Sequence, residues 1–180
     1  MRTRLALAAA ATGFLSLLAP LTSWAHGPSR QKVTETIEIN APVDKVWAVI
    51  GNFQDMSWHP AVAKTEGSGG NETNAKRTLT LGSGGTIEEQ LDEYDAQGHM
   101  YHYEITKVDP KVLPVNDYSS KLSVEGEGDK STVTWWGAFY RGYMNNDPPP
   151  ELNDEAAKTA VVGVYKAGLE ALKAKIEGGK

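Results

Sequence analysis

The fold is decided by the stretch TVTWWGAFYRGYMNNDPPPELNDEAAKTAVVGVYKAGLEALKAKI, residues 132–176. Up to Met144, successive side chains alternate with a period of two, which predicts a strand. After three prolines, apolar residues recur every three or four positions, which predicts a helix with one apolar face over about Asp154–Ile176. These positions are Ala157, Val161, Val164, Tyr165, Gly168, Leu169, Leu172 and Ile176. A strand that leads into one long terminal helix indicates a curved sheet wrapped around that helix.

The N-terminus has the pattern of a secretory signal peptide. Arg2 and Arg4 precede an apolar run, and Ser23–Ala25 places small residues at the two positions that a signal peptidase reads. The run is short for a membrane span, so an uncleaved anchor is the less favoured alternative. We therefore predict a signal peptide over residues 1–25, a periplasmic location, and a single domain over residues 26–180 that contacts no membrane after cleavage.

The predicted mature chain is acidic and lacks cysteine. Removing Arg2 and Arg4 with the signal leaves 16 basic and 23 acidic residues, a net charge of −7. This charge argues against a nucleic-acid partner, because affinity for nucleic acid depends on basic side chains that neutralise phosphates. The absence of cysteine excludes disulfides, thiol catalysis and thiolate metal sites.

Between the signal and the last strand, the sequence predicts a strand, two short helices and a series of strands. Alternation indicates a first strand over residues 33–39, Asn40-Ala41-Pro42 begins a helix, and Ser57–Pro60 forms a short helical turn or loop. Turn residues then separate strands near residues 62–66, 76–81, 86–94, 100–108, 118–124 and 132–144. Short loops favour antiparallel pairing. The predicted fold class is α+β: a curved antiparallel seven-stranded sheet around a long C-terminal helix, with two short helices after strand 1.

Alternation also predicts which side chains face the interior. Turning the apolar faces of two neighbouring strands inward puts Arg77 beside Glu89, either directly opposite or on the diagonal. The candidate cavity-lining residues are Trp47, Trp58, His59, Arg77, Glu89, Tyr101, Tyr103, Tyr118, Trp135, Phe139 and Tyr165. Aromatic walls with a few polar groups fit a small-molecule pocket, and they fit a packed core equally well. The sequence leaves both alternatives open.

Few residues offer chemistry. His59 could act as an acid or base at a pocket mouth, or could simply cap a turn or face solvent. His26, if it becomes the N-terminus, could bind copper with a second histidine nearby, but His99 and His102 lie on opposite faces of one strand. The sequence contains no nucleophile–base pair, paired metal-binding acids or phosphate-binding glycine loop. We therefore predict no catalytic residues, no metal site and no cofactor.

The segment before the last helix is unusual for its three consecutive prolines. It comprises Asn145, Asn146, Asp147, Pro148, Pro149, Pro150 and Glu151. Proline restricts the backbone and holds such a segment extended. The segment either aims the last helix, with Asn153 or Asp154 as the N-cap, or forms a rigid edge that docks a partner protein.

Several motifs resemble the START/Bet v 1-like helix-grip superfamily (SRPBCC), which includes polyketide cyclase-like proteins. They are the element order, Ala41-Pro42 followed by Val46-Trp47, Trp58-His59-Pro60, the inward Glu89 and the long terminal helix. The resemblance covers nearly all of the predicted mature chain. It implies a helix-grip fold but no particular activity, because this fold hosts lipid carriers, hormone receptors, cyclases and accessory proteins.

A second set of motifs resembles a narrower family, the periplasmic MxaD-type accessory proteins of bacterial methanol oxidation. The motifs are Ala25-His26-Gly27-Pro28, Gly70-Asn71-Glu72, Arg77–Leu81, Gly137–Gly142 and Asn145–Glu155. This resemblance implies a non-catalytic role that assists interaction and electron transfer between methanol dehydrogenase and its cytochrome c acceptor. The alternative is a carrier of a small apolar ligand in the cavity. A cyclase- or dehydratase-type enzyme that uses His59, Arg77 or Glu89 is the least favoured alternative.

Overall fold

The computed structural model describes residues 27–178. The predicted signal peptide, residues 1–25, and His26 lie outside these residues. Neither helix within residues 27–178 combines the length and the apolar character that a membrane span requires.

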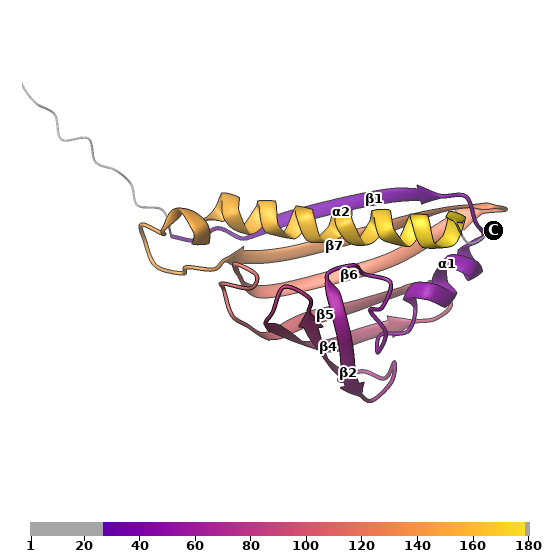
Figure 1. Cartoon of the computed structure of the whole chain (residues 1–180), viewed down its shortest axis with the longest axis horizontal. Coiled ribbons are helices and arrows are strands. Elements are labelled where there is room, and N and C mark those ends of the chain that lie inside the picture. The colour runs from indigo at the N-terminus through magenta and orange to yellow at the C-terminus, as the bar shows by residue number, and fades with distance from the viewer. Residues whose placement is uncertain (1–26, 179–180) are drawn as a thin grey trace, which may run out of the picture.

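A seven-stranded sheet and one long helix make up most of the described chain (Figure 1). The elements are β1 (Gln31–Ile39), α1 (Val43–Ile50), β2 (Val62–Ser68), β3 (Lys76–Leu81), β4 (Thr86–Asp95), β5 (Met100–Val108), β6 (Val115–Glu127), β7 (Lys130–Arg141), the 3-10 helix η1 (Pro150–Leu152) and α2 (Asp154–Gly178). The strands pair antiparallel in the order β1-β7-β6-β5-β4-β3-β2. The sheet curves around α2, which lies against β1 and β7. The predicted α+β helix-grip fold is confirmed.

One detail of the predicted fold is wrong. A single helix, α1, follows β1, and the segment predicted as a second short helix is a series of turns. Its amides make the bonds of turns: the Ser57 N–H donates to Asp55 Oδ1, and the His59 N–H donates to the Met56 carbonyl. Amides bonded in this way do not form the repeating backbone bonds of a helix.

The helix α2 buries the face that its periodicity predicts. Its buried residues are Ala157, Val161, Tyr165, Gly168, Leu169, Leu172 and Ile176, and Val164 is half-buried beside them. Two glycines permit the close approach of helix and sheet. A Cβ on Gly168 would lie 2.5 Å from the His59 ring, and one on Gly137 would collide with the Tyr165 hydroxyl.

Candidate functional site

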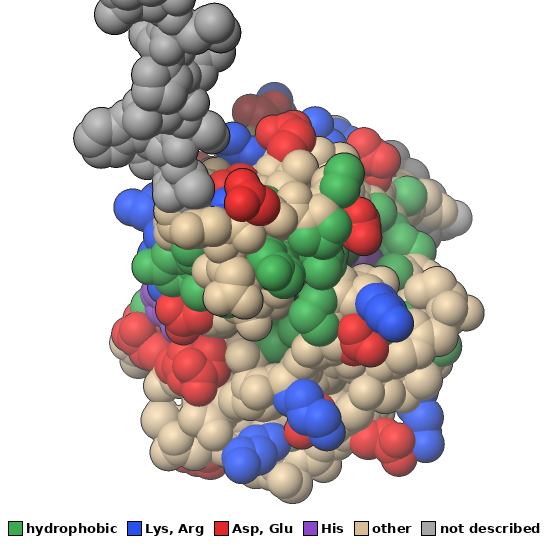
Figure 2. Space-filling view, turned by 90° about the vertical axis from the view of Figure 1, so that its left-hand side faces the viewer, with side chains coloured by type: hydrophobic (Ala, Val, Ile, Leu, Met, Phe, Trp, Pro, Cys, Tyr) green, Lys and Arg blue, Asp and Glu red, His purple; other side chains and the backbone are tan. Residues whose placement is uncertain are grey.

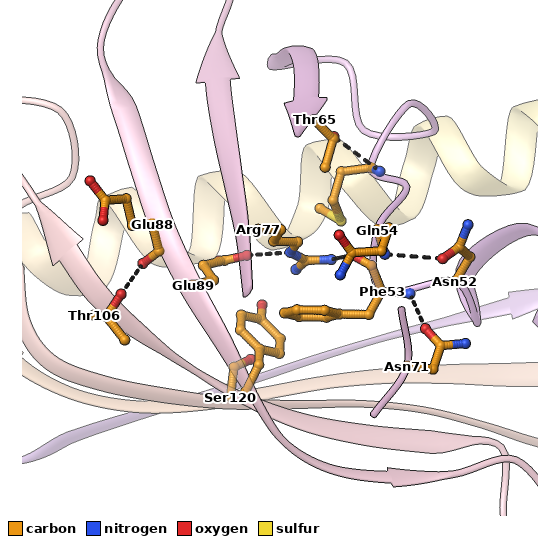
Figure 3. Close-up of polar contacts among 12 residues, drawn as sticks. Asn52, Phe53, Gln54, Thr65, Asn71, Arg77, Glu88, Glu89, Thr106 and Ser120 are labelled. Atoms are coloured by element: carbon orange, nitrogen blue, oxygen red, sulfur yellow. Dashed lines mark hydrogen bonds and ion pairs between the residues drawn. The ribbon is translucent and has the colours of Figure 1, made fainter. Parts of the chain in front are cut away.

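Arg77 and Glu89 form an ion pair inside the sheet. They are direct partners in the register of β3 and β4, and Arg77 Nε donates to Glu89 Oε2 at 2.6 Å. Only 2% of Arg77 and 5% of Glu89 is exposed. The guanidinium carbon lies 4.1 Å from the centre of the Phe53 ring, beside which Figure 3 draws it, and 5.1 Å from the centre of the Tyr103 ring. The predicted inward pair is confirmed, because turning the apolar faces of both strands inward brings these two side chains together, here as direct neighbours.

Burial and charge act in opposite directions on this pair. Burial alone would lower the pKa of Arg77, but the adjacent Glu89 charge, helped by Tyr101 and Tyr103, raises that pKa above its ordinary value. Burial raises the pKa of the Glu89 carboxyl, and the Arg77 charge offsets part of this rise. Each partner therefore compensates for the desolvation of the other, and loss of either would leave a buried charge unpaired.

Arg77 also positions the turns between α1 and β2. Its Nη1 donates to the Phe53 carbonyl at 2.7 Å (Figure 3). The Asn71 side chain donates to the Gly51 carbonyl, as does the Tyr94 hydroxyl. Together these bonds fix the backbone that leads to Trp58 and His59, so the Arg77–Glu89 pair has a clear structural role.

His59 connects these turns to α2. Its Nδ1 accepts the Ala61 N–H at 3.2 Å, so the ring proton is on Nε2, which donates to the Val164 carbonyl at 3.0 Å. Burial lowers the pKa of His59, and the bond to Val164 offsets part of the effect. His59 is therefore neutral, with both ring nitrogens engaged in bonds to the backbone.

A network of hydroxyls and one indole lies deeper in the sheet, formed by Tyr103, Tyr118, Ser120, Trp135 and Tyr165. The Trp135 indole N–H lies 3.1 Å from both the Tyr103 hydroxyl and Ser120 Oγ. The Tyr165 hydroxyl bonds to Tyr118 and Ser120, and its ring stacks on Trp135 at 4.5 Å. Burial raises the pKa of all three tyrosines, so their phenols remain protonated at neutral pH.

A cavity of about 80 Å³ opens at one end of this interior. It is lined by Met56, His59, Ala61, Val62, Leu79, Leu81, Ile87, Glu89, Tyr103, Ile105, Val112, Leu113, Tyr118, Trp135 and Val164. Its exposed and half-buried members include Ala61, Val62, Leu81, Val112 and Val164, which form the mouth. The interior is thus a packed core with a small, mainly aliphatic cavity.

The structure divides the predicted cavity-lining residues into two groups. His59, Glu89, Tyr103, Tyr118 and Trp135 line the cavity. The others do not line it: Trp47, Trp58, Arg77, Tyr101, Phe139 and Tyr165. The five aromatic members pack against other aromatic rings, and Arg77 lies over the Phe53 ring, so these side chains fill the space that the prediction left open.

The prediction missed the aliphatic character of the cavity. Alternation could have identified four of the aliphatic lining residues, since all lie on predicted inward faces: Leu79, Leu81, Ile87 and Ile105. Val112 and Leu113 were not, because they lie in the loop between β5 and β6, where no periodicity marks them. Within residues 27–178, no group of three or more histidine, aspartate or glutamate side chains could hold a metal ion.

The predicted docking loop follows β7 and is anchored by Arg141. This buried arginine donates to the carbonyls of Tyr143 and Asn145 and pairs with Asp154 at 3.1 Å. Asn145, Asn146 and Asp147 are exposed, Pro148 and Pro149 are half-buried, and Pro150 and Glu151 are exposed at the start of η1. Asn153 is the N-cap of α2, since its Oδ1 accepts the Ala156 N–H at 2.8 Å. The loop therefore aims the helix and is also presented to solvent.

Comparison with known proteins identifies the family. The model of a family described as polyketide cyclase/dehydrase and lipid transport matches residues 30–177. The chain belongs to this family. A comparison with curated proteins finds no match.

Several solved structures share the fold. An uncharacterised protein from Bacillus thuringiensis is 30% identical, with a TM-score of 0.69 over 82% of this chain and 99% of that one. The protein XoxI from Bacillus cereus is 31% identical, with a TM-score of 0.69 over 81% and 95%. The ZhuI aromatase/cyclase from Streptomyces is 17% identical, with a TM-score of 0.64 over 83% and 94%. At that identity, the likeness to the cyclase concerns the fold alone.

Proposed function

We propose that this protein is an exported, non-catalytic accessory protein that assists electron transfer between methanol dehydrogenase and its cytochrome c acceptor. The observation that carries the proposal is the contrast between its occupied interior and its exposed, anchored loop. Arg77, Glu89 and His59 are all engaged in bonds that hold the fold. The loop over residues 145–151 is fixed by Arg141, and most of its residues are exposed.

The contacts of His59 and Glu89 argue against acid–base catalysis as the main role. A catalytic base needs a free lone pair within reach of a substrate. His59 already uses both ring nitrogens, and Glu89 already gives one oxygen to Arg77. Recruiting His59 would break its bonds to Ala61 and Val164, and protonating Glu89 would leave the buried Arg77 charge without its partner.

The choice of partners rests on the sequence motifs. The resemblance to MxaD-type accessory proteins includes Gly137–Gly142 and Asn145–Glu155. These two stretches contain Arg141, the loop that Arg141 anchors and the N-cap Asn153. The second stretch therefore coincides with the loop that the fold presents to solvent, and the first contains the buried arginine that anchors it.

The test is the rate of cytochrome c reduction by purified methanol dehydrogenase. Adding this protein should raise the rate, and no change at any molar ratio would contradict the proposal. Replacing Pro148, Pro149 and Pro150 by glycine should weaken the effect, because a flexible loop costs more conformational entropy to order on docking. The variant should still fold, with a lower melting temperature because glycine raises the entropy of the unfolded chain. Pro42→Ala, near α1 and far from the loop, is the matched control and should act like the wild type.

A second candidate function is transport of a small apolar ligand, which the aliphatic lining of the cavity favours. The volume of about 80 Å³ is well below the roughly 300–1,000 Å³ of typical ligand pockets. Native mass spectrometry of protein purified from its own source would show a bound small molecule. Protein without any added mass would end this alternative.

A further inference from the structure

The mouth of the cavity and the anchored loop lie at the same end of the molecule. The two are connected through Gly142, where a Cβ would lie 3.1 Å from both Leu152 Cδ2 and Pro114. Pro114 ends the β5–β6 loop, whose Val112 and Leu113 line the cavity. Figure 2 shows hydrophobic side chains gathered over this end, with acidic side chains beside them. Among the described residues, Met144 is the large hydrophobic residue that is most exposed, at 44%.

The volume of the cavity indicates what could enter it. An apolar cavity of about 150 Å³ admits benzene or xenon. The cavity here, at about 80 Å³, has roughly half that volume. Its walls are mainly aliphatic, and its mouth is open between Val62, Leu81, Val112 and Val164. A group of three or four carbons fits this space, which is the size of a valine, leucine or isoleucine side chain.

The charges around the mouth indicate what surrounds that side chain. Residues 109–114 and 144–158 contain five acidic residues and two lysines. Asp147, Glu151 and Glu155 are exposed, and none of the three makes an ion pair with another described residue. A complementary partner surface therefore carries lysine or arginine next to its apolar contact.

We infer that the partner protein inserts one aliphatic side chain, flanked by basic residues, into this cavity while its surface rests on the anchored loop. This inference depends on the proposed accessory function and specifies the partner surface. The cavity then serves as a socket for a protein side chain, which explains why it is small, aliphatic and adjacent to the loop. A side chain that is fully enclosed at the centre of an interface is the kind of contact that dominates affinity.

The test fills the cavity from α2. Val164 lines the cavity, whereas Val162, two residues away on the same helix, does not, so Val164→Phe and Val162→Phe form a matched pair. Affinity for methanol dehydrogenase and for its cytochrome c acceptor is measured by calorimetry, and entry of xenon into the cavity is measured by NMR. Val164→Phe should exclude xenon and weaken binding about tenfold to hundredfold, while Val162→Phe should match the wild type. Ile105→Phe fills the cavity from β5 and replaces Val164→Phe if that variant does not fold.

The outcomes separate this inference from the proposed function. If the filled variant excludes xenon but binds both proteins as tightly as the wild type does, the insertion is contradicted and the accessory role stands. If xenon fails to enter the wild-type protein, the cavity is closed and the insertion is contradicted. If the wild type binds neither protein and leaves the electron-transfer rate unchanged, both the function and the insertion fail.

Discussion

Two buried arginines each hold a loop through an ion pair and hydrogen bonds to backbone carbonyls, but one loop turns into the core and the other faces solvent. Arg77 pairs with Glu89 and donates to the Phe53 carbonyl, and Arg141 pairs with Asp154 and donates to the carbonyls of Tyr143 and Asn145. The loop that Arg77 holds turns inward, with Phe53 fully buried. The loop that Arg141 holds faces solvent. A buried guanidinium can therefore either complete a core or stiffen a surface, depending on where its backbone acceptors lie.

The largest expected effect on stability comes from removing the partner of Arg77, the arginine that holds the buried loop. Glu89→Ala should lower the free energy of unfolding by roughly 3–5 kcal/mol, because it leaves the Arg77 charge buried without its partner. Urea denaturation measures this change. The neighbouring Glu88 forms a pair of similar length with Lys107, but on the exposed face, so Glu88→Ala is the control and should have little effect. A loss below about 1 kcal/mol for Glu89→Ala would mean that the pair behaves like a solvated surface contact.

Removing Arg141, the arginine that holds the exposed loop, should lower stability less and should act more locally. Arg141→Ala removes three charge-assisted hydrogen bonds, which we expect to cost about 2–3 kcal/mol. Limited proteolysis should then cut within residues 142–153 and leave the turns around Phe53 intact. Arg30→Ala is the control, since within residues 27–178 the Arg30 side chain donates hydrogen bonds to the side chains of Asp117 and Ser119 and to no backbone carbonyl. Equal protection of the loop in Arg141→Ala and wild type would show that Arg141 does not anchor it.

The next effect tests the packing of the inner region against α2. Gly168→Ala would place a Cβ 2.5 Å from the His59 ring and 2.9 Å from Trp135, and the resulting strain should cost about 1–3 kcal/mol. A Cβ on Gly163 of the same helix would meet nothing within 4 Å. Gly163→Ala should therefore stabilise the protein by about 0.5–1 kcal/mol. The same change at two helix positions should thus have opposite signs in thermal unfolding.

The smallest expected effect concerns the protonation of His59. Burial lowers its pKa from the ordinary value of 6.5, so below about pH 6.5 the unfolded chain takes up a proton that the folded protein does not. Stability should therefore fall as the pH decreases from 6.5, and this part of the slope should be absent in His59→Asn. Glu89 is present in both proteins, so its contribution to the pH dependence of stability cancels when one curve is subtracted from the other. A slope in His59→Asn that runs parallel to that of the wild type would contradict the assignment.

The sequence predicts the fold well because local patterns determine it. Period-two alternation in β3 and β4 places Arg77 beside Glu89, directly opposite or on the diagonal, and the structure has the former. The helical period predicts the buried face of α2. The cavity is harder to predict from the sequence, because its shape depends on how closely the sheet approaches the helix. Trp135 and Tyr165 stack and fill the centre, which alternation does not show. Val112 and Leu113 enter from a loop, and the acceptors of Arg141 are backbone carbonyls that no side-chain pattern marks.

The most direct test of the account is hydrogen–deuterium exchange of this protein with and without methanol dehydrogenase and its cytochrome c acceptor. Because the account places the contact at the end anchored by Arg141, exchange should slow in residues 142–153 and 109–114. It should remain unchanged in α1 and in the turns that Arg77 holds. Protection confined to α1 and those turns, or no protection in either loop, would contradict the account.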